Sequence, residues 1–146
     1  MLLITLVPTL GYAAPQTYFC QDSLGKLPIR QDGRVKPLYV HANETIKHLT
    51  GENTHKGLTA VQTYCLLSLD GMGMTQDLEL KTSVQHVKVK KLLGLSEEQN
   101  TIPYTELKSW STDLRRAWAG QEMKNSYKKS LGTLMGKLNL YQEIKS

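Results

Sequence analysis

The side chains with the widest chemical range in this chain are its histidines, which bind metals and transfer protons. They are His41, His48, His55 and His86. His41 and His48 are seven residues apart and would share one face of a helix, with Glu44 beside them. Two helical turns separate their rings by about 10 Å, too far for one metal ion unless a third element supplies a ligand. We therefore expect no metal or haem site, and we expect the histidines to be exposed to solvent.

Nucleophilic catalysis would need a reactive side chain beside a base and an orienting group. The chain has no G-x-S-x-G motif, and Cys65 lies in an apolar run that disfavours its thiolate form. No paired carboxylates stand out, and Gly71-Met72-Gly73 alone is too short to indicate a phosphate-binding loop. The sequence therefore predicts a protein that is not an enzyme and needs no cofactor.

The two cysteines, Cys20 and Cys65, leave two interpretations open. They could form a disulfide in an oxidising compartment, or they could be buried thiols that pack as small hydrophobic groups. A third role, as a thiol-redox helper, is disfavoured because the chain has no C-x-x-C motif.

A charged, turn-rich segment over residues 27–38 is the strongest candidate for a binding site. Arg34 and Lys36 alternate with Val35, so both would project from one side of an extended chain. Arg34 suits a bidentate contact with a carboxylate. That carboxylate belongs either to a partner or to the chain's own Glu44 or Asp32, which would pin the segment to its domain. The candidate partner-binding residues are Arg30, Gly33, Arg34, Lys36 and Pro37.

The first residues of the chain are uncharged and apolar and then reach small side chains, which is typical of a signal peptide. We predict a signal peptide over residues 1–13, with cleavage after Ala13. Net charge is +5, and from Lys81 onward 12 Lys and Arg stand against 6 Asp and Glu. This basic half is either a solvated helix face or a surface that contacts anionic lipid headgroups. No pattern typical of a nucleic-acid-binding module appears, so we expect no nucleic-acid partner.

Periodicity predicts a mainly α-helical fold that positions these residues. We expect an extended segment over residues 14–38, a helical domain over 39–146, and at most one short strand or hairpin. The first helix would carry the apolar stripe Tyr39, Ala42, Ile46 and Leu49 and end at Gly51.

Five further elements are expected along the helical domain. A second helix would open at Thr59 with a capping box to Gln62, and its apolar residues would lie at the centre of the core. A short strand is expected within 78–84. A short helix would close at Gly94 and another would start at Ile102-Pro103-Tyr104. The last helix would cover 127–141, with an apolar stripe of Tyr127, Leu131, Leu134, Leu138 and Tyr141.

The segment LPIRQDGRVKPLYVHANETIKHLTG resembles the "LPVQ-x-x-GR-x-KPLDT-x-A" segment of system II (ResB–CcsA type) cytochrome c biogenesis proteins. The resemblance covers residues 27–107 and includes HKGLTAVQTYCLLSLD, VKVKKLLGL and IPYTEL. The chain departs from the family at Tyr39 and Val40, where the family has Asp-Thr. It also has no tryptophan-rich haem-binding loop and no membrane helices with axial histidines.

The resemblance implies a stand-alone form of the family's extracytoplasmic domain. The expected function is that of a non-catalytic periplasmic accessory factor in cytochrome c biogenesis, which acts by protein binding. Its expected partner is a membrane-embedded haem-handling protein. The alternative is an exported helical interaction domain of unrelated role.

Overall fold

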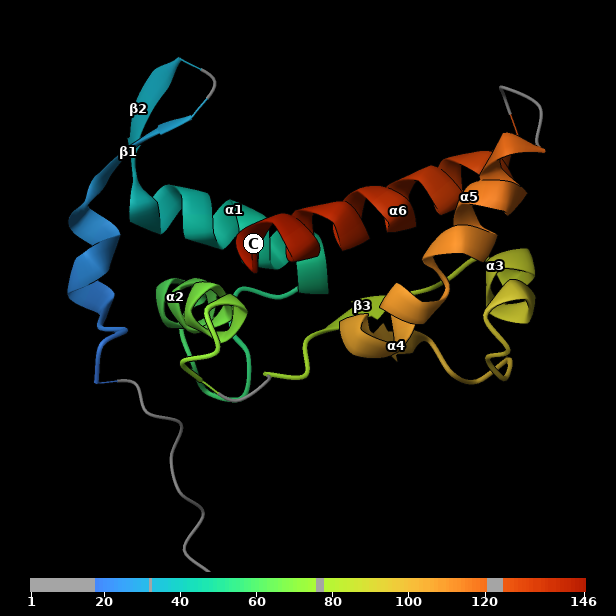
Figure 1. Ribbon diagram of the computed structural model, residues 1–146, viewed down its shortest axis with the longest axis horizontal. Helices are drawn as coiled ribbons and strands as arrows, with labels where there is room; N and C mark the ends of the chain where they lie inside the picture. The colour runs from blue at the N-terminus through green and yellow to red at the C-terminus, as the bar shows by residue number, and fades with distance from the viewer. Residues whose placement is uncertain (1–17, 32, 76–77, 121–124) are drawn as a thin grey trace, which may run out of the picture.

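The computed structural model describes residues 18–31, 33–75, 78–120 and 125–146. The predicted signal peptide over 1–13 lies outside the described residues, as does Asp32. The described part is mainly helical, as predicted, and its ribbon is shown in Figure 1. In chain order the elements are η1 (Asp22–Lys26), β1 (Pro28–Gln31), β2 (Arg34–Pro37), α1 (Leu38–Thr50), α2 (Ala60–Gly71), β3 (Lys81–Ser83), α3 (Val87–Leu92), β4 (Thr101–Pro103), α4 (Tyr104–Ser109), α5 (Ser111–Ala119) and α6 (Ser126–Ile144).

The strand content exceeds the prediction of at most one strand or hairpin. β1 and β2 form one antiparallel pair, and β3 and β4 form a second. The strand expected within 78–84 is β3, and its partner β4 occupies residues that the sequence assigned only to a helix start. The N-terminal segment is also less extended than expected, because η1 is a turn of 3₁₀-helix within it.

Helix α1 ends and helix α2 begins where the sequence predicts, for the predicted reasons. The Gly51 backbone has φ 90, a left-handed conformation that ends α1 without the steric cost of a side chain. Thr59 and Gln62 form the complete capping box at the start of α2. One member of the predicted α1 stripe is misplaced, because Tyr39 is 60% exposed.

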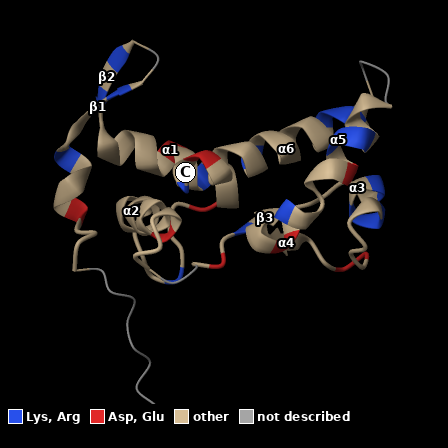
Figure 2. Cartoon of the chain, in the orientation of Figure 1, with Lys and Arg blue, Asp and Glu red and all other residues tan. Residues whose placement is uncertain are grey.

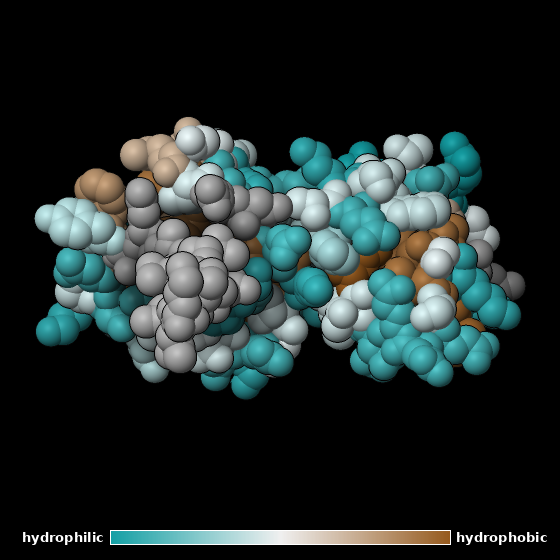
Figure 3. Space-filling model, turned by 90° about the horizontal axis from the view of Figure 1, so that it is seen from below, coloured by the Kyte–Doolittle hydropathy of each residue, from teal (hydrophilic) through white to brown (hydrophobic). Residues whose placement is uncertain are grey.

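Helix α6 runs along most of the molecule and organises its core (Figure 1). It contacts α1 and α2 towards one end and α3, α4 and α5 along its length. Its buried face carries Leu131, Leu134, Leu138 and Tyr141, as the sequence stripe predicts. Figure 3 shows hydrophobic side chains, in brown, at the surface of the right-hand end, where Figure 1 places α3, α4 and α5.

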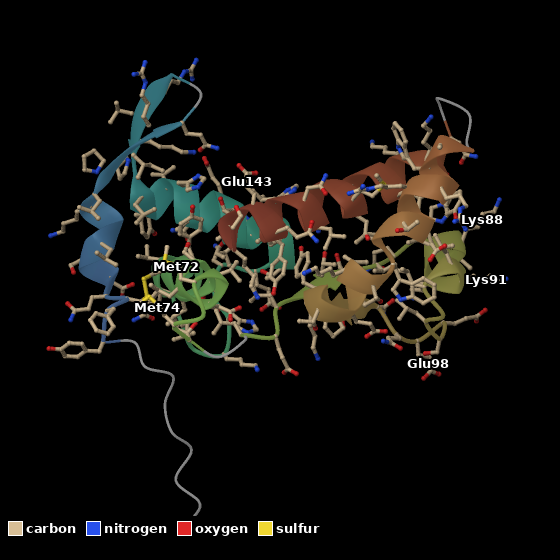
Figure 4. The ribbon with its side chains drawn as sticks, viewed as in Figure 1. Met72, Met74, Lys88, Lys91, Glu98 and Glu143 are labelled. Atoms are coloured by element: carbon tan, nitrogen blue, oxygen red, sulfur yellow. A yellow bond between two sulfur atoms is a disulfide. The ribbon has the colours of Figure 1, made fainter. Side chains whose placement is uncertain are left out.

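Cys20 and Cys65 form a disulfide, with their Cα atoms 5.6 Å apart. The sequence left a disulfide and two buried thiols as alternatives, and the structure has the disulfide. The bond joins the chain just before η1 to the middle of α2, and Figure 4 draws it in yellow at the left-hand end. It therefore fixes the segment that leads into β1 against the helical body.

Tyr104 is a buried ionisable residue, and its titration makes the stability of the fold depend on pH. Its ring is fully buried and stacks on Tyr141, and its hydroxyl donates to the Leu49 carbonyl at 2.7 Å. Burial raises the pKa of Tyr104 far above its ordinary value of 10.0, and a hydrogen bond with Thr82 lowers it by less. The folded chain therefore keeps a proton that the unfolded chain loses at about pH 10.

We expect the free energy of unfolding to fall as pH rises above about 10. Tyr104→Phe should cost about 1–2 kcal/mol at neutral pH, because the Leu49 carbonyl loses its donor. The gap between wild type and variant should then shrink above about pH 10, since the variant has no proton to lose there. Urea unfolding across pH 8–11 measures this gap, and a constant gap would contradict the assignment of the buried proton to Tyr104.

Candidate functional site

The hairpin formed by β1 and β2 projects from one end of the molecule, beyond the start of α1 (Figure 1). Its register pairs Ile29 with Lys36, Arg30 with Val35 and Gln31 with Arg34. Gly33, with φ 77, supplies the positive φ that the tight turn requires. Paired residues point to the same side of a sheet, so Arg34 and Lys36 share one face and Arg30 and Val35 share the other.

Lys36 attaches the hairpin to the helical body. Its Nζ forms an ion pair with Glu44 of α1 at 2.5 Å. From the sequence, Glu44 was one of the two carboxylates that Arg34 could contact to pin this segment to the domain. In the structure Lys36, and not Arg34, contacts Glu44. The Lys36 and Glu44 side chains are 25% and 62% exposed, so the pair contributes at most about 1 kcal/mol.

Arg30 and Arg34 are exposed, and no described residue forms an ion pair with either of them. Pro37 is also exposed, at the base of the hairpin where α1 begins. Figure 2 shows this basic character, with blue on both strands and no red on the described part of the hairpin. Within the described residues, the Arg30 and Arg34 guanidinium groups therefore remain available to pair with carboxylates of a partner.

Three hydrophobic side chains are exposed on the hairpin or next to its base. Val35 is 71% exposed, Tyr39 is 60% exposed and Leu27 is 52% exposed. We call Leu27, Arg30, Arg34, Val35 and Tyr39 the hairpin patch. Tyrosine and arginine, two of the residue types in this patch, are enriched at the energetic centre of protein interfaces. The hydrophobic half of this patch was not predicted from the sequence, although Val35 stands between Arg34 and Lys36 in the chain.

The supports of the hairpin patch lie directly beneath it. Gly25 of η1 packs so closely on Tyr39 and Val61 that an added Cβ would lie 3.1 Å from the Tyr39 Cβ. Beneath this contact, Ala42 and Ile46 of α1 pack with Val61 in a small buried cluster. The Leu38 amide also donates to the Leu27 carbonyl at 2.8 Å, which extends the hairpin pairing by one residue pair. The patch is therefore held by packing and hydrogen bonds at its base.

The histidines do not converge on one site. His41 packs edge-on against Tyr64, and burial, with a smaller effect of Lys36, lowers the pKa of His41. The His55 Nε2 lies 2.8 Å from the Leu78 carbonyl, and His86 caps the start of α3. Only His48 has the exposed position that we expected for all four. Among the described residues, no cluster of three or more His, Cys, Asp or Glu could hold a metal ion.

The cysteines bear on a thiol-redox role, and the helices bear on insertion into a membrane. Cys20 is fully buried within its disulfide, so another thiol could reach that sulfur only after local opening. In the part of the chain that the structure covers, no helix combines the length and the hydrophobicity needed to cross a bilayer. Comparison with models of protein families and with curated proteins finds no match to this chain.

Proposed function

We propose that this protein is a non-catalytic, exported accessory factor that assists the assembly of c-type cytochromes by binding a partner through the hairpin patch. The observation that carries the proposal is a projecting hairpin with exposed Val35 and Arg30 on one face and exposed Arg34 on the other, neither arginine having an ion-pair partner among the described residues. The sequence resemblance to system II biogenesis proteins includes this hairpin. It therefore suggests the same process and the same kind of partner, a membrane-embedded haem-handling protein in the periplasm.

The geometry of the patch suits protein recognition. The hairpin is held at its base by the Lys36–Glu44 pair and by the hydrogen bond from Leu38 to Leu27, so little ordering is needed on binding. Arg30 and Arg34 would pair with carboxylates of the partner. Val35, on the face of Arg30, and Tyr39, at the start of α1, would add buried apolar area to these charged contacts. The partner surface should therefore combine acidic and apolar side chains.

Charge reversal on the hairpin tests the proposed surface. The double variant Arg30→Glu/Arg34→Glu should lower covalently bound haem on c-type cytochromes to the level of a strain that lacks the protein. Stability should change by less than about 0.5 kcal/mol, since both side chains are exposed. Haem-stained gels measure the first effect and thermal unfolding followed by circular dichroism measures the second.

The matched control is Lys108→Glu/Arg115→Glu, which makes the same change in charge at exposed positions on α4 and α5, away from the hairpin. This control should leave haem attachment unchanged. If it lowers haem attachment as much as the hairpin variant does, net charge matters and the hairpin patch is not the docking surface.

A further inference from the structure

A pocket of about 240 Å³ lies between the end of β3, the start of α3 and one face of α6. It is near the opposite end of the molecule from the hairpin (Figure 1). Its polar lining includes Ser83, His86, Lys129, Ser130 and Lys137. Val84, Val89 and Leu134 give it an apolar wall. The residues that line this pocket include neither Asp nor Glu.

The two lysines give the pocket an uncompensated positive charge. No described residue forms a salt bridge with Lys129 or Lys137. The Lys137 Nζ donates to the Thr82 hydroxyl at 3.3 Å, and burial lowers the pKa of Lys137. An ammonium group that is withdrawn from water without a counter-charge is unfavourable. An anion in the pocket would offset that cost.

Neutral donors lie in the same lining. The His86 Nδ1 accepts a hydrogen bond from the Lys88 amide at 3.2 Å, so the neutral ring carries its proton on Nε2. Ser83 and Ser130 add hydroxyl groups from β3 and α6. The lysines and these neutral groups therefore come from three different elements and can approach an anion from several directions.

This donor set points to a phosphate group. Lysine binds phosphate as a point charge with three donors, whereas planar carboxylates are matched best by arginine, and no arginine lines the pocket. The volume is below the roughly 300 Å³ of sites for drug-sized ligands. We propose that the pocket binds the phosphate group of a small phosphomonoester or of a lipid headgroup, with the organic part against Val84, Val89 and Leu134.

The surroundings of the pocket would also attract an anion. Figure 2 shows basic residues, in blue, on α3, on α5 and at the start of α6. Lys88 and Lys91 of α3 point outward into solvent at this end of the molecule (Figure 4). Clustered charge of one sign raises the local concentration of the opposite ion.

Phenyl phosphate and inorganic phosphate are the soluble probes, followed by amide chemical shifts in NMR spectra of the ¹⁵N-labelled protein. Phenyl phosphate should produce saturable shifts confined to residues 83–89 and 129–137. Lys129→Gln and Lys137→Met should each weaken its binding by about tenfold, the effect of one lost charge-assisted hydrogen bond. Lys129 is exposed, so its variant tests binding even if Lys137→Met perturbs folding. Lys26→Gln, in η1 near the other end, should leave the affinity unchanged.

Cosedimentation with phosphatidylcholine vesicles that contain phosphatidylglycerol separates the two sources of phosphate. Saturable binding of a soluble probe that either pocket variant weakens supports a small phosphorylated ligand. Binding to vesicles alone, again weakened by Lys129→Gln, supports a lipid headgroup. The proposal is overturned if no probe binds saturably, or if Lys26→Gln weakens binding as much as the pocket variants do.

Discussion

Replacing Cys20 and Cys65 together by alanine should lower the free energy of unfolding by about 4 kcal/mol. The two cysteines are 45 residues apart in sequence, and the disulfide removes the conformational freedom of that loop from the unfolded chain. The loop-entropy relation gives about 4 kcal/mol for a loop of this length. Guanidinium unfolding of the wild type and the variant under non-reducing conditions measures the difference.

The reduced wild type provides the control for this experiment. In the presence of a strong reductant, wild type and variant should unfold at nearly the same denaturant concentration, because both then lack the cross-link. A difference of less than about 1 kcal/mol between oxidised wild type and variant would show that the bond does not constrain the unfolded chain. A structural disulfide also favours an oxidising compartment, which agrees with the proposed export.

Leu138→Ala should cost about 2–5 kcal/mol, the range for removing a large aliphatic side chain from a packed core. Leu138 is 2% exposed, and α6, which carries it, packs on helices from both ends of the molecule. A cavity there would loosen both ends together. Asn139→Ala is the matched control, since Asn139 is the exposed neighbour on the same helix and its change should cost less than about 0.5 kcal/mol.

Unfolding curves from circular dichroism measure both variants. A loss below about 0.5 kcal/mol for Leu138→Ala would mean that α6 is not packed against the core. A loss confined to one end, seen as two separate transitions in the variant, would show that the domain does not unfold as one cooperative unit.

Local signals in the sequence correctly predicted the end of α1 and the start of α2. The left-handed glycine at the end of α1 and the capping box at the start of α2 act through neighbouring backbone groups, so a few residues suffice to identify them. The buried stripe of α6 also follows from its own spacing. Each of these features depends on residues that are near one another in the chain.

Features that depend on contacts between distant segments were not predictable in the same way. The sequence predicted a strand at β3, but it did not predict β4, which pairs with β3 across an intervening helix. The end of α2 approaches the end of α6 so closely that a Cβ on Gly71 would lie 2.1 Å from the Lys145 carbonyl oxygen. Nothing in the neighbourhood of Gly71 in the sequence indicates that contact.

In the candidate site, too, local features followed from the sequence and contacts between distant segments did not. The alternation of Arg34 and Lys36 correctly placed both on one face of an extended strand. Which of them meets Glu44 depends on where the hairpin lies on α1, and this is fixed by packing beneath Tyr39. The exposure of Tyr39 could not be inferred from its helical spacing, because the spacing fits the buried stripe.

The most direct test of the proposed function is the haem content of c-type cytochromes in a clean deletion strain without a paralogue. If the protein assists cytochrome c assembly, covalently bound haem on haem-stained gels should fall, while apocytochrome synthesis and b-type haem stay unchanged. Reintroducing the wild-type gene should restore haem attachment, and the Arg30→Glu/Arg34→Glu variant should not. Normal covalent haem staining in the deletion strain would contradict the role in cytochrome c assembly.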